Sequence, residues 1–208
     1  MSEPTAFHAF RIHADRDNYR AGVESMPIDA LTPGEVLVKV AWSSVNYKDA
    51  LAGTGKGKIL RASPLNGGID AAGYVVASSD PKVREGDQVL CTGCNLSETR
   101  DGGYGEYVRL ESKWTIPLPS GLTLRESMIL GTAGFTAALS LYQMIRNGQT
   151  PAMGPIVVTG ATGGVGMLAI DILTRAGFEA HAISGKLEHF DDLIAVGARQ
   201  CISRKDLY

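Results

Sequence analysis

The chain has 208 residues, of which 44% are hydrophobic and 20% are charged, and its formal net charge is −2. This length suits one large domain or two modest ones. The near-neutral, scattered charge argues against a nucleic-acid-binding protein, which would carry a basic patch. No apolar run approaches a membrane span, and the N-terminal sequence MSEPTAFHAF lacks the pattern of an export signal. We therefore expect a cytoplasmic protein without nucleic-acid or membrane partners.

The three cysteines do not form a metal-binding or disulfide pattern. Cys91 and Cys94 form a C-x-x-C pair, but no second pair or nearby histidine completes a four-ligand zinc site. A thioredoxin-like pair opens a helix, whereas QVLCTGCNL is typical of a strand that runs into a loop. The odd count, with Cys201 alone, favours a reducing compartment. We interpret Cys91 and Cys94 as two small residues at a strand end.

Residues 1–122 have the pattern of short strands separated by turns. The strand candidates are rich in Val, Tyr and Thr with partial alternation, and turn sequences such as TPGE and TRDGGYGE separate them. This pattern predicts a compact, barrel-like β domain, with one short helix at NYKDALA. The predicted strands are residues 6–12, 35–45, 72–78, 87–92 and 105–110.

Residues 123–208 have a different character. LRESMILGTAGFTAALSLYQMIRNG predicts an apolar linking helix that ends at Gly148 and breaks near Gly131–Gly134. Strands and helices then alternate as in βαβ units, which require a parallel sheet with right-handed crossovers. Only three parallel strands are predicted, so we expect the first half of a Rossmann-type domain in a truncated chain. The predicted strands are 155–161, 178–185 and 199–203, and the predicted helices are 164–177 and 187–198.

A glycine-rich turn, VVTGATGGVG at residues 157–166, joins the first of these strands to its helix. It aligns with the dinucleotide fingerprint G-x-G-x-x-G, with Ala161 at the first glycine position. We predict that Gly163 allows the backbone to approach a pyrophosphate and that Gly166 allows the helix to pack closely. The helix N-terminus would direct free N–H groups at the phosphates. A purely structural turn is the alternative. The predicted cofactor-binding residues here are Ala161, Thr162, Gly163, Gly164, Val165 and Gly166.

The second parallel strand indicates which dinucleotide is bound. An NAD-preferring site has Asp or Glu at its end, about twenty residues beyond the fingerprint. Here the strand ends HAISGK, with Ser184, Gly185 and Lys186. A hydroxyl and an ammonium group suit a 2′-phosphate, and Arg204 could add a second cation, although each cation is also explained as a solvated surface charge. The sequence predicts NADPH/NADP as the cofactor.

This order of a β domain, an apolar helix and VTGATGGVG resembles a medium-chain dehydrogenase/reductase, a two-domain α/β family. Its N-terminal GroES-like β-barrel precedes a Rossmann-type domain. More narrowly, SSVNYKDALAG, GGIDAAGYV, GTAGFTAA and ISGK are similar to the YhdH/AcuI type. Those quinone-oxidoreductase-like proteins act as NADPH-dependent acryloyl-CoA reductases.

The resemblance implies hydride addition to the C=C bond of a small α,β-unsaturated thioester such as acryloyl-CoA. A quinone or free enone is the alternative acceptor, and a truncated, non-catalytic NADPH-binding module is a further alternative. The resemblance implies a homodimer for the full-length protein. It also implies a zinc-free branch, because Asn46, Ile69 and Ala133 stand where zinc-dependent relatives have ligands.

The resemblance further implies that the catalytic residues lie in NYKD. Tyr47 would contact the nicotinamide and orient the substrate, and Asn46 would donate to the carbonyl oxygen. Asp49 would complete this set, although it could equally cap its short helix. GTAGFTAA would bring backbone near the nicotinamide, with Thr136 as a candidate contact. A basic segment could bind CoA phosphates, although an exposed charged loop is the commoner explanation: Lys48, Lys56, Lys58 and Arg61.

Overall fold

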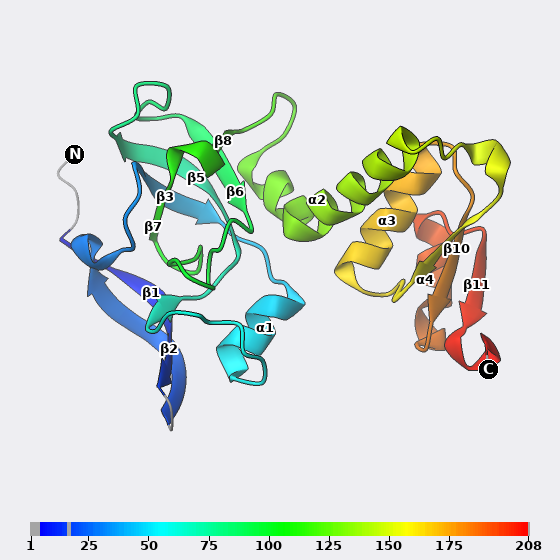
Figure 1. The fold of residues 1–208 in the computed structure, drawn as a ribbon, viewed down its shortest axis with the longest axis horizontal. Coiled ribbons are helices and arrows are strands. Elements are labelled where there is room, and N and C mark those ends of the chain that lie inside the picture. The colour runs from blue at the N-terminus through cyan, green and yellow to red at the C-terminus, as the bar shows by residue number, and fades with distance from the viewer. Residues whose placement is uncertain (1–4, 16–17, 208) are drawn as a thin grey trace. The chain divides into compact units, whose positions relative to one another are not determined.

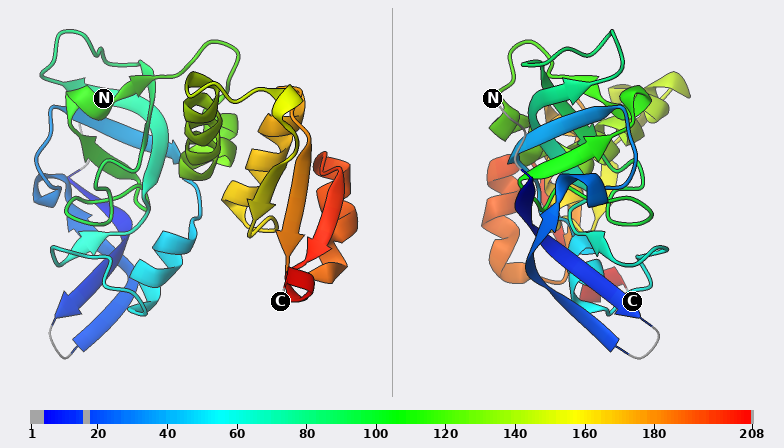
Figure 2. Two further views of the ribbon diagram at one scale, coloured as in Figure 1. Left: turned by 45° about the vertical axis from the view of Figure 1, so that its right-hand side comes forward. Right: turned by 90° about the vertical axis from the view of Figure 1, so that its left-hand side faces the viewer.

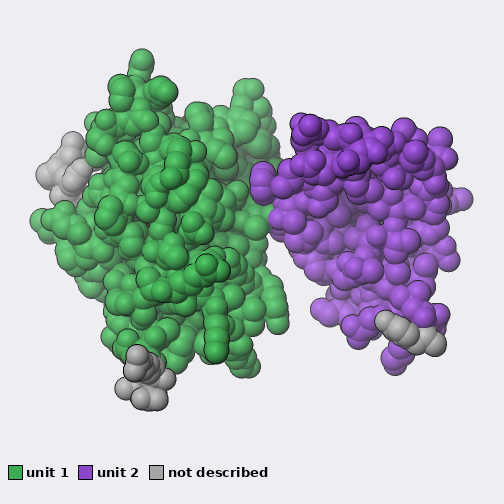
Figure 3. Space-filling view, in the orientation of Figure 1, with its two compact units in different colours: residues 1–132 green, residues 133–208 purple. Residues whose placement is uncertain are grey.

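The computed structural model describes residues 5–15 and 18–207, and only the backbone of Asn18. The first residues of the N-terminal sequence considered for an export signal, 1–4, lie outside this part. The chain divides into two compact units, residues 1–132 and 133–208 (Figure 3). The sequence predicts a boundary after residue 122, whereas the division lies inside helix α2 (Leu124–Arg146).

Unit 1 contains two antiparallel sheets in its described residues, with strand orders β7-β3-β5-β6-β8 and β2-β1-β4 (Figure 1). Alternate side chains of β3 and β5 point into the core, so Val36, Val38 and Val75 are almost fully buried. The elements are β1 (Ala6–Asp15), β2 (Asn18–Pro27), β3 (Val36–Trp42), α1 (Tyr47–Thr54), β4 (Leu65–Asn66), β5 (Asp70–Ser78), β6 (Gln88–Thr92), β7 (Tyr107–Leu110) and β8 (Ile116–Pro117). Short 3-10 helices lie at Ile28–Ala30 and Ser112–Trp114.

The sequence analysis missed β2, the second strand of the long hairpin in Figure 1. Its sequence, NYRAGVESMP, is polar, contains a glycine and shows no clear alternation. It forms a strand because it pairs with β1 along its whole length, from Ala6↔Pro27 to Asp15↔Asn18. Strand formation here depends on the pairing partner more than on local propensity. The two-residue strands β4 and β8 were missed as well.

Helix α2 is interrupted at Gly131, as the sequence predicts, where the backbone has φ 49° and ψ −155°. By length and composition α2 could cross a membrane, which the sequence analysis did not anticipate. Its two pieces instead enter the cores of the two units. Leu124 and Met128 are buried with Ala72 in unit 1, and Leu141 is buried with Ile170 in unit 2.

Unit 2 contains a three-stranded parallel sheet with the order β11-β10-β9 among its described residues (Figure 2). Strand β10 pairs in parallel with β9, beginning at Ala180↔Ile156, and with β11, beginning at His181↔Gln200. The helices α3 and α4 are adjacent, because Thr174 Oγ1 donates to the Gly197 carbonyl at 3.0 Å. This is the predicted βαβαβ arrangement. Its elements are β9 (Ile156–Thr159), α3 (Gly164–Arg175), β10 (Ala180–Ser184), α4 (Phe190–Val196) and β11 (Gln200–Ser203), with 3-10 helices at Pro151–Met153, Leu187–His189 and Arg204–Leu207.

Candidate functional site

The glycine-rich turn has the conformation that the fingerprint requires. Gly160 lies at the end of β9 with φ +61°, a conformation that favours glycine. Gly163 donates its N–H to the Gly160 carbonyl at 2.9 Å and precedes α3 as its N-cap. The Met167 N–H bonds to the Gly163 carbonyl, so the preceding N–H groups, at 164–166, have no acceptor within the helix. A helix N-terminus of this kind favours an anion.

Gly166 lies in the tightest contact of this turn. A Cβ atom there would stand 2.5 Å from the Gly160 carbonyl oxygen and 2.7 Å from Ala161 Cα. Both are backbone atoms that cannot move aside without opening the turn. The structure thus shows why Gly166 permits the helix to approach the strand.

Replacing Gly166 with valine is expected to destabilise unit 2 by about 1–3 kcal/mol or more, because the turn must open. Gly164→Ala is the matched control, since a Cβ there meets only Ala133 Cβ at 3.6 Å. We expect the control to stay within about 1 kcal/mol of the wild type. Urea unfolding followed by circular dichroism measures both, and equal stability of the two variants would contradict this packing.

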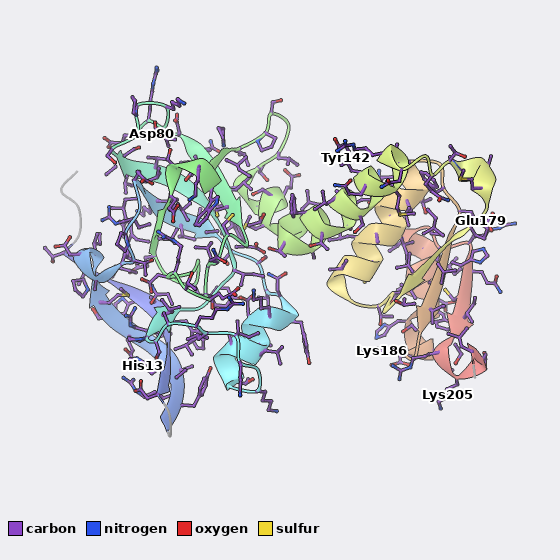
Figure 4. The ribbon with its side chains drawn as sticks, viewed as in Figure 1. His13, Asp80, Tyr142, Glu179, Lys186 and Lys205 are labelled. Carbon is purple, nitrogen blue, oxygen red and sulfur yellow. The ribbon has the colours of Figure 1, made fainter. Side chains whose placement is uncertain are left out.

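A hollow of about 430 Å³ lies beside the turn in unit 2. It is formed at the carboxyl ends of the parallel strands, and Figure 4 shows Lys186 and Lys205 at this end of the sheet. The sequence predicts five of the nine residues around it and misses Ile183, Leu207 and the two residues that end β9 and begin the turn. The lining residues are Thr159, Gly160, Thr162, Ile183, Ser184, Gly185, Lys186, Arg204 and Leu207.

The polar groups of this hollow converge on the end of β10. Ser184 Oγ accepts the Lys186 N–H at 3.1 Å and lies 3.2 Å from Thr162 Oγ1. The Arg204 guanidinium lies against Gly185, where a Cβ would stand 3.4 Å from its Nη2. The lining contains two cations and hydroxyl groups but no carboxylate. This donor set fits a phosphate monoester, and the helix N-terminus beside it fits a pyrophosphate.

Unit 1 contains a polar cluster around one buried carboxylate, which the sequence analysis missed in part: Ser44, Asn46, Asp70 and Thr132. Asp70, the first residue of β5, is fully buried. Its carboxylate accepts hydrogen bonds from Asn46 Nδ2 at 2.9 Å, Thr132 N at 3.0 Å, Thr132 Oγ1 at 2.5 Å and the Ser44 hydroxyl. The donors come from two separate parts of the sequence, the segment before α1 and the middle of α2, and the acceptor comes from a third, β5. We call this group the Asp70 cluster.

The break in α2 serves this cluster. Gly131 has a positive φ, and a Cβ there would stand 2.8 Å from Asp70 Oδ2 and 3.0 Å from Ser44 Oγ. The absence of a side chain leaves room for the carboxylate, and the irregular backbone directs the next N–H, that of Thr132, at it. The helix interruption that the sequence predicts near Gly131–Gly134 therefore makes room for the Asp70 carboxylate and supplies it with a backbone hydrogen bond.

Asn46 and Asp49 are brought together as the start of α1. Asp49 Oδ2 accepts the Asn46 N–H at 2.8 Å, and its Oδ1 accepts the Ile69 N–H at 2.9 Å. Asp49 therefore caps its helix, which is the alternative that the sequence left open. Burial raises the pKa of the Asp49 carboxyl above its usual value, against several hydrogen bonds that lower it.

The amide group of Asn46 is directed into the cluster. Asn46 Nδ2 lies 2.9 Å from both Ser44 Oγ and Asp70 Oδ2, and 3.3 Å from Asp49 Oδ2. With these acceptors its two N–H bonds are already used. Donation from Asn46 to a substrate carbonyl would require this arrangement to change.

The two remaining predicted contacts lie outside the Asp70 cluster. Tyr47, the first residue of α1, is 80% exposed, so its phenol is available to a ligand. Thr136 lies in the part of α2 that belongs to unit 2, where its carbonyl accepts the Ser140 hydroxyl at 2.8 Å.

The positions compared with zinc ligands carry one amide and two apolar side chains: Asn46, Ile69 and Ala133. Ile69 is a buried apolar residue, and no group of three metal-ligating side chains occurs in the described ranges. Cys91 packs in the hydrophobic core of unit 1, and burial raises the pKa of its thiol.

Residues 32–120 match the alcohol dehydrogenase GroES-like domain. The chain is 46% identical to a putative quinone oxidoreductase, YhfP of Bacillus subtilis, over 98% of this chain and 62% of that protein. It is 44% identical to a probable acrylyl-CoA reductase, AcuI of Escherichia coli, over 89% of this chain and 57% of that protein.

Solved structures agree with these sequence relationships. The yhdH oxidoreductase of Salmonella enterica, in complex with NADP, has a TM-score of 0.93 and 42% identity over 97% of this chain and 62% of its own. YhfP, crystallised with NAD bound, has a TM-score of 0.92 and 45% identity over 99% of this chain and 62% of its own. The chain thus spans about three fifths of the length of these relatives. It belongs to the medium-chain dehydrogenase/reductase superfamily, in its quinone-oxidoreductase-like branch.

Proposed function

We propose that this chain is part of an NADPH-dependent reductase that acts on the C=C bond of a small α,β-unsaturated thioester, acryloyl-CoA first. The observation that carries the proposal is the hollow at the end of β10. Its lining includes Ser184, Lys186 and Arg204 and contains no carboxylate. Two cations at this place fit the 2′-phosphate that distinguishes NADPH from NADH. The relatives named acrylyl-CoA reductase and the NADP complex of yhdH support this choice.

Each residue of the hollow has a proposed role in binding. Lys186 and Arg204 would hold the 2′-phosphate, with the Ser184 hydroxyl between them and the β9–α3 turn. The N–H groups at the start of α3, at Gly164 and Val165, would bind the pyrophosphate. NADPH, when bound, supplies the hydride for the reduction. Thr136 stays a proposed contact of the cofactor.

The Asp70 cluster would act by fixing the start of α1. Ser44, Asn46 and Thr132 all donate to Asp70, and Asn46 in turn precedes the exposed Tyr47. We expect the Tyr47 hydroxyl to donate to the carbonyl oxygen of the acceptor, where negative charge develops during reduction. Asp49, as the helix cap, would keep Tyr47 at a fixed position.

The basic segment around α1 suggests how CoA would be recognised. Glu98 pairs with Lys48 at 2.7 Å and with Arg61 at 3.0 Å. Lys56 and Lys58 are exposed and form no ion pair with the other residues that the structure describes. They are therefore the charges available to the phosphates of CoA.

The double variant Lys56→Glu/Lys58→Glu is expected to raise KM for acryloyl-CoA by about tenfold or more, because each lost phosphate contact costs about 1 kcal/mol. KM for a small enone, which carries no phosphate, should change by less than about twofold. Lys82→Glu/Arg84→Glu is the matched control, since these exposed residues lie on the β5–β6 connection. An equal rise in KM for both acceptors would contradict CoA binding at this segment.

Oxidation of NADPH, followed at its absorbance maximum with acryloyl-CoA, a quinone and a simple enone in parallel, tests the proposed function. A higher kcat/KM for the thioester supports the proposed function, and a higher kcat/KM for the quinone would identify the quinone as the acceptor. NADPH binding without turnover on any acceptor would identify a cofactor-binding module only. The cytoplasmic location and the homodimer of the full-length protein stay predictions.

A further inference from the structure

Tyr104 connects three segments of unit 1. Its N–H donates to the Gly67 carbonyl at 2.8 Å, and its carbonyl accepts the Phe10 N–H at 2.7 Å. The backbone of Tyr104 is thereby attached both to β1 and to the segment that leads from β4 into β5. These two hydrogen bonds fix the position of the backbone from which the Tyr104 side chain extends.

The direction of the Tyr104 ring is fixed as well. Phe10 contacts it edge to face, with 6.4 Å between ring centroids and an interplanar angle of 71°. Gly68 has φ +92°, and a Cβ there would stand 2.6 Å from Tyr104 Cδ1, while a Cβ on Gly67 would stand 3.0 Å from Cδ2. The pair Gly67–Gly68, part of GGIDAAGYV, is needed because the ring occupies the space of both side chains.

The Tyr104 hydroxyl reaches the Asp70 cluster from this fixed ring. It donates to the Ser44 carbonyl at 2.8 Å. The Ser44 side chain bonds Asp70 and lies 2.9 Å from Asn46 Nδ2. One hydrogen bond from Tyr104 thus holds the backbone of Ser44, one of the donors to Asp70.

We propose that Tyr104 is a positioning residue for the reduction: its hydroxyl holds Ser44 so that Asn46 and Asp70 keep the geometry that places Tyr47. This inference rests on the proposed function. Tyr104 touches neither substrate nor cofactor in this account. It acts through the Ser44 carbonyl and through the neighbouring Asp49 side chain, which interacts with its hydroxyl.

The charges around the hydroxyl keep it a donor. Burial raises the pKa of Tyr104 far above its usual value, and the carboxylates of Asp49 from α1 and Asp70 from β5 raise it further. The phenol therefore stays protonated at neutral and moderately alkaline pH. Its hydrogen bond to Ser44 is present throughout the range in which an enzyme of this class would be assayed.

Tyr104→Phe removes only this hydroxyl, and Tyr107→Phe is the matched control. The Tyr107 ring packs edge to face on Phe7, with 5.6 Å between centroids, and its hydroxyl forms no hydrogen bond within the described part of the chain. We expect Tyr104→Phe to lower kcat by about fivefold to tenfold, with KM for NADPH within about twofold of wild type. Both variants should lose no more than about 5 °C in unfolding midpoint.

A second measurement does not depend on turnover. In ¹H–¹⁵N spectra of the full 208-residue chain, the side-chain amide signals of Asn46 should shift in Tyr104→Phe and stay in place in Tyr107→Phe. Unchanged Asn46 signals in Tyr104→Phe overturn the proposal, as does an equal loss of kcat in both variants. If the wild type shows no turnover, the proposed function fails, and the Asn46 signals alone decide whether Tyr104 positions the cluster.

Discussion

Replacing both Lys186 and Arg204 with alanine is expected to weaken NADPH binding by about 10²- to 10⁴-fold, while NADH binding changes by less than about threefold. Each cation is expected to make a charge-assisted hydrogen bond to the 2′-phosphate, worth roughly 1.5–3 kcal/mol. NADH lacks that phosphate and gains nothing from either side chain. The loss should therefore be selective for one cofactor.

Lys205→Ala is the matched control for this double variant. Lys205 is an exposed cation next to Arg204 in the chain, and it does not line the hollow. Fluorescence titration of the three proteins with each cofactor gives the dissociation constants. A similar loss of affinity for NADH and NADPH would mean that the two cations act on the fold or on the pyrophosphate.

Replacing Asp70 with alanine is expected to have the largest effect in unit 1. The change removes the buried acceptor that the Ser44 and Thr132 hydroxyls and the Asn46 amide share. The loss of several hydrogen bonds to a buried carboxylate predicts a decrease of about 3–5 kcal/mol in unfolding free energy. Turnover should fall by about 100-fold or more, because the start of α1 is no longer fixed.

Asp70→Asn separates the two effects. It keeps the volume of the side chain but replaces one acceptor oxygen with a donor group that faces the existing donors. We expect a smaller loss of stability than for alanine and a comparable loss of turnover. Asp29→Ala, at an exposed aspartate of the same unit, is the control and should stay within about 0.5 kcal/mol. Full activity of Asp70→Asn would contradict a role for the cluster.

The local features of the chain were predictable because they depend on neighbours in sequence. The turn at 157–166 has its strand before it and its helix after it, so the fingerprint predicts the position of the turn, and its role in cofactor binding stays a prediction. The absence of an acidic residue at the end of HAISGK can likewise be seen from the neighbouring residues alone. The packing of Gly166 on Gly160 then follows from the geometry of the turn itself.

The Asp70 cluster was not predictable in the same way. Asp70 stands at the start of an ordinary strand sequence, and its donors lie 24 to 62 positions away. No local pattern relates them, since only the fold brings the break at Gly131 next to the segment before α1. Strand β2 was missed for a similar reason, because its pairing with β1 outweighs a polar sequence without alternation.

Parallel titration of the 208-residue chain with NADPH and NADH, followed by cofactor fluorescence, tests the central claim most directly. Both cofactors can use the glycine-rich turn, so the difference between their dissociation constants reports on the hollow formed by Ser184, Lys186 and Arg204. We expect NADPH to bind at least about 100-fold more tightly than NADH. Equal affinity, or a preference for NADH, would contradict it.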